Sequence, residues 1–393
     1  MLQIKNDYLE AVFHKYSHVV LFGGGAVTSA MLAAYEEQEF AKKIDYILDN
    51  DRSRDGKSLS INGREMTLIS PESFAGLNYK DYALIIMPVF FLDIVRKIDR
   101  NVLFDGIPTY IYAFMMNGER RRDFSLKTTE QMKIPKIIHY CWFGGKAIPE
   151  NYKNNIESWK KYCPDYEIVE WNETNYDFKK NQFMYDAYLT KNWAYVSDYA
   201  RKDVVYNYGG IYLDVDVEIL KPLDDLLYNK FFMCRDDVAN IATGAGFGAE
   251  KKNEIIKSLR DDYENHRFID ESGRVIGKAC GNYETASMIR YGYRPDNECQ
   301  TIAGGKIYPR EVLCPVSWMG LPDSYTDRTV AVHKYDDFLV DKEGKENAPE
   351  LRKEIRGLLE RASARGTQEP FKVRREREDL SEYIAQRRLL ALQ

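Results

Sequence analysis

The chain has 393 residues, 44% of them hydrophobic and 30% charged, with a formal net charge of −5. This length suits two domains and this balance a soluble, core-forming protein. The slight acidic excess argues against a nucleic-acid partner. The six cysteines are scattered without metal-like spacing, and no long apolar run or leader-like N-terminus stands out. The sequence predicts a cytoplasmic protein without a transmembrane segment, and leaves peripheral association with the inner face of the membrane open.

Residues 1–116 alternate short apolar runs with helical patterns, which predicts a Rossmann-like α/β domain with a parallel sheet. Three consecutive glycines, Gly23 to Gly25, follow the first run and resemble a dinucleotide-binding turn, with Asp49 after the second run. The third glycine of that fingerprint is replaced by Thr28. Two interpretations stay open: a structural or acceptor-organising module, or one that binds a nucleotide or coenzyme. The expected strands are 19–22, 44–48, 83–87 and 109–113, with a helix from Gly25 to about Phe40.

A polar linker is expected at 117–133, and a second α/β domain at 134–340. A charged helical segment at 341–393 should follow, with an apolar stripe that we expect to be a docking face. In the second domain, a helix ends at Gly209-Gly210 and leads into an alternating run over 211–220. The expected elements are strands at 135–140, 167–171 and 211–220, and helices at 152–162 and 195–208.

The run over 211–220 carries acids on one predicted face. Tyr212, Asp214, Asp216 and Glu218 alternate with apolar residues, which places all four side chains on the same side of the expected strand. Like charges so close repel unless a cation lies between them, and carboxylates suit Mg²⁺ or Mn²⁺. The alternative to a metal site is an exposed edge strand whose acidic side chains are simply solvated.

Asp198 and Arg201 lie three residues apart on the preceding helix and therefore share a face. The Gly209-Gly210 turn should bring that face close to the acidic run. An aspartate can hold sugar hydroxyls, and an arginine can hold sugar or phosphate oxygens through its planar fork. A surface salt bridge is the competing interpretation of the pair alone.

The run AYVSDYARKDVVYNYGGIYLDVDV, which ends at Val217, resembles glycosyltransferase family 32, whose signature is a DXD sugar-binding region. Three further segments resemble the same family: PKIIHYCWFGG, ESWKKYCPDYEIVEWNE and KIYPREVLCP. The likeness covers roughly residues 134–335, and the family core is similar to that of the clostridial glucosylating toxins. It implies a GT-A fold, a Mn²⁺ or Mg²⁺ cofactor, and in most members retention at the anomeric carbon.

The resemblance also implies roles for individual residues. Asp198, Arg201, Asp214 and Asp216 would be the catalytic group, with Asp216 and Asp214 at the metal. His333 falls where the family has a late histidine near the metal, but the Ser-Trp pair that commonly follows is replaced by Asp336-Asp337-Phe338-Leu339. Either Asp337 or Asp336 then serves as a metal ligand, or the C-terminal lid differs. The donor-binding positions implied are Tyr140, Cys141, Trp142, Phe143, Ser197, Tyr212 and Asn282, with Trp142 stacking on the base.

The expected activity is transfer of a hexose from a nucleotide-diphosphate sugar, with UDP favoured by the resemblance. The acceptor would be a glycan or lipid-linked glycan in bacterial capsule or exopolysaccharide synthesis. Two alternatives remain at this stage. One is glycosylation of a protein hydroxyl, and the other is a nucleotide- or coenzyme-binding protein that works through the N-terminal fingerprint.

Overall fold

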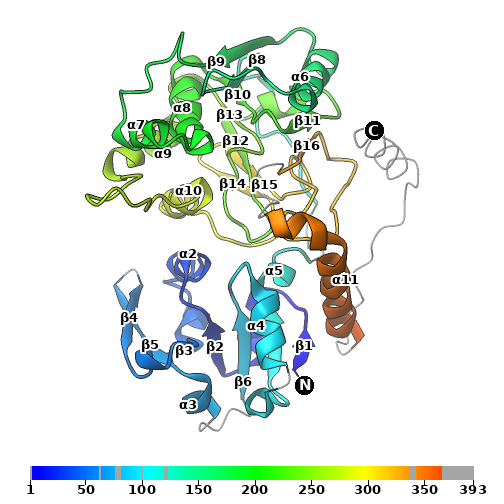
Figure 1. Ribbon diagram of the computed structural model, residues 1–393. Coiled ribbons are helices and arrows are strands. Elements are labelled where there is room, and N and C mark those ends of the chain that lie inside the picture. Colours follow the sequence, from blue (N-terminus) through cyan, green and yellow to red (C-terminus); the bar gives the residue numbers. More distant parts are fainter. Residues whose placement is uncertain are drawn as a thin grey trace.

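The computed structural model describes residues 2–61, 63–75, 81–99, 101–118, 123–335 and 342–364. The described chain builds two seven-stranded sheets, one after the other along the sequence, and a separate two-stranded sheet. Figure 1 shows the first sheet at the bottom and the second above it. The protein is therefore of mixed α/β class, with parallel strand pairs in both large sheets.

The first sheet has the strand order β1-β7-β6-β2-β3-β5-β4. All its pairs are parallel except the β4–β5 hairpin. The central strands are almost fully buried on both faces, as their runs of valine, isoleucine and leucine favour. The strands are β1 (Gln3–Lys5), β2 (His18–Phe22), β3 (Ile44–Leu48), β4 (Ser58–Ile61), β5 (Arg64–Ile69), β6 (Tyr82–Ile86) and β7 (Pro108–Ile111).

The four runs expected as strands in this part are strands, and the sequence patterns missed β1, β4 and β5. The helix expected to reach about Phe40 ends earlier, at Ala34, because a polar turn follows and only a 3-10 turn continues. The last expected strand likewise stops at Ile111, where a short helix begins. The helical elements here are α1 (Leu9–Lys15), α2 (Ala26–Ala34), η1 (Glu39–Lys43), η2 (Arg52–Arg54), α3 (Pro71–Ala75), α4 (Phe91–Ile98), η3 (Val102–Phe104) and α5 (Tyr112–Met115).

The second sheet has the order β14-β15-β12-β13-β10-β8-β9 and mixes parallel with antiparallel pairs. Separately, β11 pairs antiparallel with β16. The strands are β8 (Ile137–Cys141), β9 (Glu167–Trp171), β10 (Gly210–Tyr212), β11 (Val217–Ile219), β12 (Phe231–Cys234), β13 (Phe247–Ala249), β14 (Gln300–Ile302), β15 (Gly305–Tyr308) and β16 (Ala331–His333).

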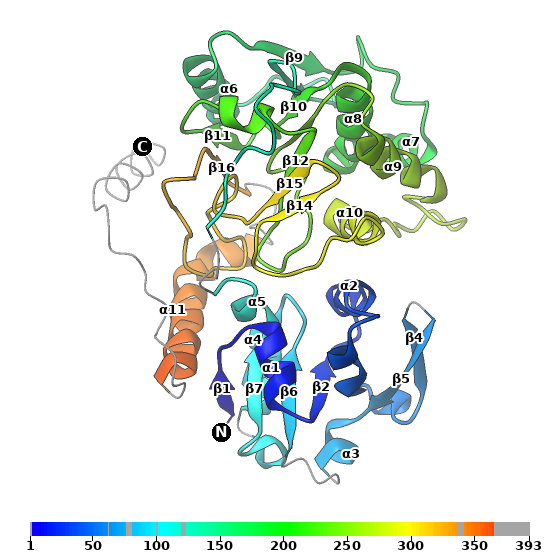
Figure 2. The same ribbon diagram turned by 180° about the vertical axis from the view of Figure 1, so that it is seen from behind.

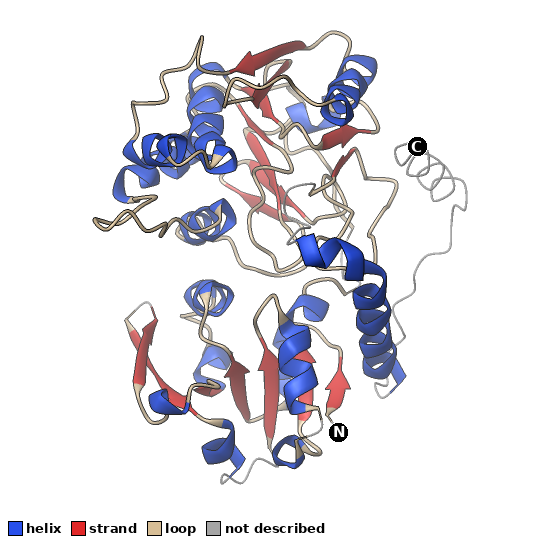
Figure 3. Ribbon diagram, viewed as in Figure 1, coloured by secondary structure: helices blue, strands red, loops and turns tan. Residues whose placement is uncertain are grey.

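Helices cover the second sheet on two sides. Figure 3 shows α7, α8 and α9 gathered on one side, with α6 on the other. Side-chain caps start two of them: Asn181 accepts from the Met184 amide, and Asn253 accepts from the amides of Ile255 and Ile256. The helical elements are α6 (Glu150–Tyr162), α7 (Gln182–Leu189), α8 (Trp193–Tyr208), η4 (Asp224–Leu227), α9 (Glu254–Asp261), η5 (Asp262–Asn265) and α10 (Cys280–Ile289).

The prediction of one continuous strand over 211–220 is wrong for the middle of that run. β10 ends at Tyr212 and β11 begins at Val217, and the two belong to different sheets. Residues 213–216 instead form a turn, closed by the Val217 amide, which donates to the Asp214 carbonyl at 3.0 Å. The two aspartates therefore lie in a tight turn where the chain leaves the second sheet.

The two halves of the described chain contact each other directly, through helices and loops that lie between the two sheets. Helix α2 packs against α10, as both views show (Figures 1 and 2). The hydroxyls of Tyr35 and Tyr112 both donate to the Pro295 carbonyl, at 3.4 and 3.3 Å. Each half therefore fixes the position of the other through buried polar contacts as well as apolar ones.

Helix α11 (Lys342–Ala364) fastens the C-terminal part of the described chain to the first sheet. It packs along β1, and Arg361 pairs with Asp99 at 2.8 Å. Of the apolar stripe expected there, Ile355, Leu358 and Ala362 are buried and Leu351 is partly exposed. Among the described residues, no helix is long and apolar enough to cross a membrane.

Candidate active site

An acidic turn and a histidine converge at the junction of the second sheet and the β11–β16 pair. The register of that pair sets Val217 opposite His333, so the residue before Val217 lies beside the histidine. Asp216 Oδ1 is 3.2 Å from His333 Nε2, and the Lys334 amide donates to the Asp216 carbonyl. Ligand atoms of Asp214, Asp216 and His333 all lie within 4.8 Å of one another. Three side chains of types that can bind a metal ion thus lie close together.

Asp214 is held from two sides. The Tyr212 hydroxyl donates to its Oδ1 at 2.8 Å, and its amide donates to the Gly244 carbonyl at 3.1 Å. The absence of a side chain at Gly244 makes room for this carboxylate, because a Cβ there would overlap Asp214 Oδ2 and force it to move. The carboxylate is therefore fixed by a close backbone approach from a loop thirty residues further along the chain.

Helix α8 brings a second charged pair to the same place. Arg201 Nη2 is 3.1 Å from Asp198 Oδ1 and 3.5 Å from Asp214 Oδ1, and it donates to Ser197 Oγ at 2.7 Å. Both members of the i, i+3 pair are buried. Since Arg201 contacts both Asp198 and Asp214, it connects the helix to the acidic turn.

The link between α8 and β10 depends on two glycines. Gly209 and Gly210 have φ values of +73° and +101°, which side-chain-bearing residues rarely adopt. A Cβ on Gly210 would also crowd the Ile137 carbonyl of β8. This reversal turns the chain directly from the Asp198/Arg201 helix into the strand that leads to Asp214, as the sequence predicts.

Burial shifts the titration of these groups. Burial raises the pKa of Asp198 to about 6 even though Arg201 lowers it, and burial likewise raises the pKa of Asp214. For His333, burial acts to lower the pKa, but the nearby Asp216 and Asp214 carboxylates together raise the pKa above its ordinary value. Perturbed groups clustered in this way are typical of functional sites.

We expect activity to fall below about pH 6, where Asp198 takes up a proton and no longer acts as a charged acceptor. Because its folded-state pKa lies above the unfolded value, protonation of this group favours the folded state as the pH falls. The loss would therefore not come from unfolding driven by Asp198. Rates of the donor hydrolysis that the family resemblance implies, measured from about pH 8 to about pH 5 with thermal midpoints alongside, test this. A flat profile down to pH 5 would contradict it.

The side chains at the end of β8 and just after it do not lie together; these are Tyr140, Cys141, Trp142 and Phe143. Successive side chains of a strand point to opposite faces. Cys141 and Phe143 pack into the core on the α8 side, and Cys141 lies close enough to Arg201 and Asp214 for their charges to affect its thiol. Tyr140 and Trp142 belong to the α6 side. The residues expected to form one donor-binding group are therefore split between two faces.

Trp142 lies in an open pocket of about 490 Å³ beside α6. Its indole nitrogen donates to the Lys146 carbonyl at 2.6 Å, and its ring meets Tyr152 edge-on at 6.0 Å. Tyr140 lines the same pocket and donates to Glu170 at 2.8 Å. Neither Asp214 nor Asp216 contributes to the lining.

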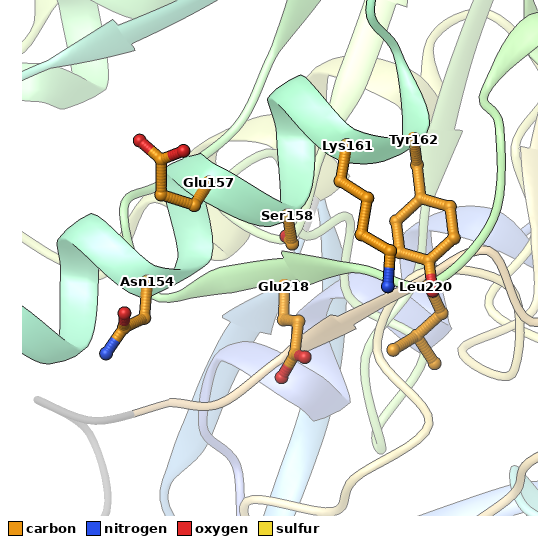
Figure 4. A pocket seen from close by; sticks show the side chains of 7 residues that line it. All are labelled: Asn154, Glu157, Ser158, Lys161, Tyr162, Glu218 and Leu220. Carbon is orange, nitrogen blue, oxygen red and sulfur yellow. The ribbon is translucent and has the colours of Figure 1, made fainter.

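Glu218, expected on the same face as the two aspartates, lies elsewhere. Figure 4 shows it with Lys161 and Tyr162 in a smaller pocket of about 180 Å³ between α6 and β11. Its carboxylate is 3.1 Å from Lys334 Nζ. The turn over 213–216 breaks the alternation, so the shared face that a continuous strand would give does not extend to Glu218.

Asn282 lies in the first turn of α10, not in an open turn, and its amide donates to the Ala279 carbonyl. Two residues on, Glu284 is buried and accepts from Thr243 Oγ1, which in turn contacts Arg201. Thr243, Gly244 and Glu284 are not among the site residues predicted from the sequence. The glycine-rich run ATGAGFGAE could have drawn attention to the first two. Asp336 and Asp337 lie outside the described residues.

The residues present suit a divalent metal ion. Two carboxylates and an imidazole form a donor set that Mn²⁺ accepts readily and Mg²⁺ less so. His333 Nδ1 is buried and has no hydrogen-bond partner among the described residues. The nitrogen of His333 that faces Asp216, and therefore the proposed metal, is Nε2.

Residues 149–232 match the family model described as a glycosyltransferase sugar-binding region containing a DXD motif. The matched segment includes Asp198, Arg201 and the Asp214-Val215-Asp216 turn, which is the D-X-D sequence. The part of the chain that holds Asp198, Arg201 and the acidic turn is therefore similar to glycosyltransferase sugar-binding regions of the DXD type.

Three curated relatives are fungal. Inositol phosphoceramide mannosyltransferase 1 of Schizosaccharomyces pombe is 28% identical over 201 residues, covering 46% of this chain and 63% of the relative. Inositol phosphoceramide mannosyltransferase 3 of the same yeast is 32% identical, covering 36% and 41%. Mannosyl phosphorylinositol ceramide synthase SUR1 of Saccharomyces cerevisiae is 27% identical, covering 35% and 37%. The chain spans less than two thirds of the length of these relatives.

Two solved structures are also similar. The PaToxG glycosyltransferase aligns with a TM-score of 0.35 and 20% identity, covering 42% of this chain and 71% of that one. A glycosyltransferase involved in glycosylation of the PBCV-1 major capsid protein aligns with a TM-score of 0.32 and 14% identity, covering 55% and 100%. At these TM-scores the superpositions do not define the fold.

Proposed function

We propose that the protein is a divalent-metal-dependent glycosyltransferase that moves a hexose from a nucleotide-diphosphate sugar to a glycan or lipid-linked acceptor. The observation that carries this proposal is the convergence of Asp214, Asp216 and His333 beside the buried Asp198/Arg201 pair. It lies mostly within the matched DXD region. Hydrolysis of a panel of UDP- and GDP-sugars in Mn²⁺ tests it, because turnover of none of them would contradict a donor site of this kind.

The metal would be held by Asp216, Asp214 and His333, with Mn²⁺ the better match for a mixed oxygen and nitrogen set. When bound, such an ion stabilises the negative charge that develops on the leaving phosphate, a contribution of several kcal/mol. Any part taken by Asp337 stays a prediction.

Asp198 and Arg201 would position the donor sugar. The guanidinium fork of Arg201 is fixed by Ser197 and Asp198, so it is already oriented when a sugar arrives. Preorganisation of this kind reduces the entropy cost of reaching the reacting geometry. With retention, which the family resemblance implies, the departing phosphate would accept the proton of the acceptor hydroxyl.

We expect Trp142→Ala to weaken binding of the donor's nucleoside diphosphate by roughly 1–3 kcal/mol, the usual range for loss of one base–aromatic stack. The partly exposed ring in an open pocket supports a stacking role. Calorimetry with UDP and GDP in Mn²⁺ measures the effect. An unchanged dissociation constant would mean that the base lies elsewhere and that Trp142 serves only to pack against α6.

Two lines of argument bear on the identity of the donor and the acceptor. The names of the fungal relatives favour mannose as the sugar and a phosphoinositol lipid as the acceptor. The resemblance stated from sequence favours UDP as the nucleotide and bacterial capsule or exopolysaccharide synthesis as the process. Both sets fit a glycan or lipid-linked acceptor, reached by a cytoplasmic enzyme that can associate with a membrane surface.

We also propose a division into domains at 1–116 and 134–340, joined by 117–133, with 341–393 as a C-terminal segment. The extent of each large sheet supports this division. Two of the three glycines in the turn of the first part lie against side chains of the protein itself. A Cβ on Gly24 would press on Leu59, and one on Gly23 would press on Pro88. The space at Gly23 and Gly24 is thus used by the protein's own side chains, whereas a Cβ on Gly25 would meet no atom within 4 Å. The crowding at the first two glycines favours a structural or acceptor-organising role.

A further inference from the structure

Behind Arg201 lies a buried ion pair that takes no direct part in the proposed chemistry. Lys202 Nζ on α8 is 2.5 Å from Glu284 Oε1 on α10, and the two side chains are 0% and 1% exposed. Lys202 also donates to the Asp198 carbonyl at 2.7 Å. Burying two charges is expensive, and the pair is weak evidence for stability in itself. The position of the Lys202–Glu284 pair close to Arg201 points to a role other than stability.

The pair reaches Arg201 through one hydroxyl. Thr243 Oγ1 donates to Glu284 Oε1 at 2.7 Å, which leaves the lone pairs of the same oxygen to accept from Arg201 Nη1 at 3.4 Å. Thr243 is fully buried, and its amide also approaches Glu284, at 3.4 Å. Glu284 therefore sets both the direction of the hydroxyl and the position of the backbone that carries it.

The same loop reaches the acidic turn one residue later. The Gly244 carbonyl accepts a hydrogen bond from the Asp214 amide. Because a glycine has no side chain, Gly244 also leaves room for Asp214 Oδ2. The short segment 243–244 thus contacts both Arg201 and Asp214, whose relative position matters for the proposed site. A shift of that segment would move Arg201 and Asp214 together.

We propose that the Lys202–Glu284 pair is a positioning device that acts through Thr243 to hold Arg201 in register with Asp214. This inference rests on the proposed function, because Arg201 matters to turnover only if it grips the donor sugar. Lys202, Glu284 and Thr243 are positioning residues and do not touch the substrate. Their effect should appear in kcat and not in the affinity for a nucleoside diphosphate that carries no sugar.

Thr243→Val tests the relay with little change in volume. We expect kcat for donor hydrolysis to fall between about tenfold and about 100-fold, the size of loss that misplacement of a reacting group produces. Dissociation constants for UDP and GDP in Mn²⁺ should stay within about twofold. Thr243→Ser keeps the hydroxyl and should restore most of kcat. Thr109→Val removes an equally buried hydroxyl from β7 and should leave kcat unchanged.

A second variant keeps the test valid if Thr243→Val does not fold. Lys202→Met combined with Glu284→Leu replaces the pair by apolar groups, a change that buried ion pairs often tolerate. It should lower kcat in the same way. Wild-type kcat in either folded variant would overturn the positioning role alone, provided that wild-type protein turns over a donor. Absence of any wild-type turnover would overturn the proposed function as well.

Discussion

Asp216→Asn should lower kcat for donor hydrolysis by about 100-fold or more, since several kcal/mol of charge stabilisation depend on the metal that Asp216 would hold. The change is nearly isosteric and removes one charge from a set whose ligand atoms lie within 4.8 Å. The thermal midpoint should stay near that of the wild type. Loss of the contact with His333 is offset by relief of repulsion with Asp214. Mn²⁺ titration by calorimetry should show weakened binding.

Glu218→Gln is the matched control for this change. It removes a carboxylate two residues further on, but Glu218 lies in the smaller pocket between α6 and β11 and pairs with Lys334. Hydrolysis should continue at close to the wild-type rate. Equal losses in the two variants would show that net charge near the turn matters, and not ligation by Asp216.

Arg201→Lys should lower kcat by about 10²- to 10³-fold, the usual loss when one preorganised donor is removed from an active site. Lysine keeps the positive charge, but its single nitrogen cannot replace a fork that contacts Ser197, Asp198, Asp214 and Thr243 together. The nucleoside diphosphate should still bind, because this group is proposed to hold the sugar. Steady-state kinetics and calorimetry together separate the two effects.

Arg260→Lys provides the control, since Arg260 is a largely buried arginine on α9 that pairs with Asp203 and Asp261. That variant should keep wild-type kcat. Retention of activity by Arg201→Lys would mean that only its charge is needed, and the positioning argument would fail.

Local patterns predicted the parts of the site that depend on neighbouring residues. The i, i+3 spacing of Asp198 and Arg201 is enough to pair them, and Gly209-Gly210 marks the end of the helix that carries them. The period of two along β8 also predicts that Cys141 and Trp142 point to opposite faces, while the family resemblance implied only that they lie at the same strand end.

Other parts of the site could not be read from local pattern. An alternating run looks the same whether it continues as a strand or breaks into a turn between two sheets, so the turn over 213–216 was missed. Thr243 and Glu284 reach Arg201 from segments more than forty residues away. Their role depends on how α10 and the 243–244 loop pack against α8, which is a property of the tertiary structure.

The most direct test of the central claim is the metal dependence of donor hydrolysis. Wild-type protein, incubated with a sugar nucleotide that it turns over, should release nucleoside diphosphate in Mn²⁺, stop in excess EDTA, and resume when Mn²⁺ is restored. This follows because Asp214, Asp216 and His333 converge on one point and suit a divalent ion. An undiminished rate in excess chelator would contradict a metal-dependent glycosyltransferase site at this turn.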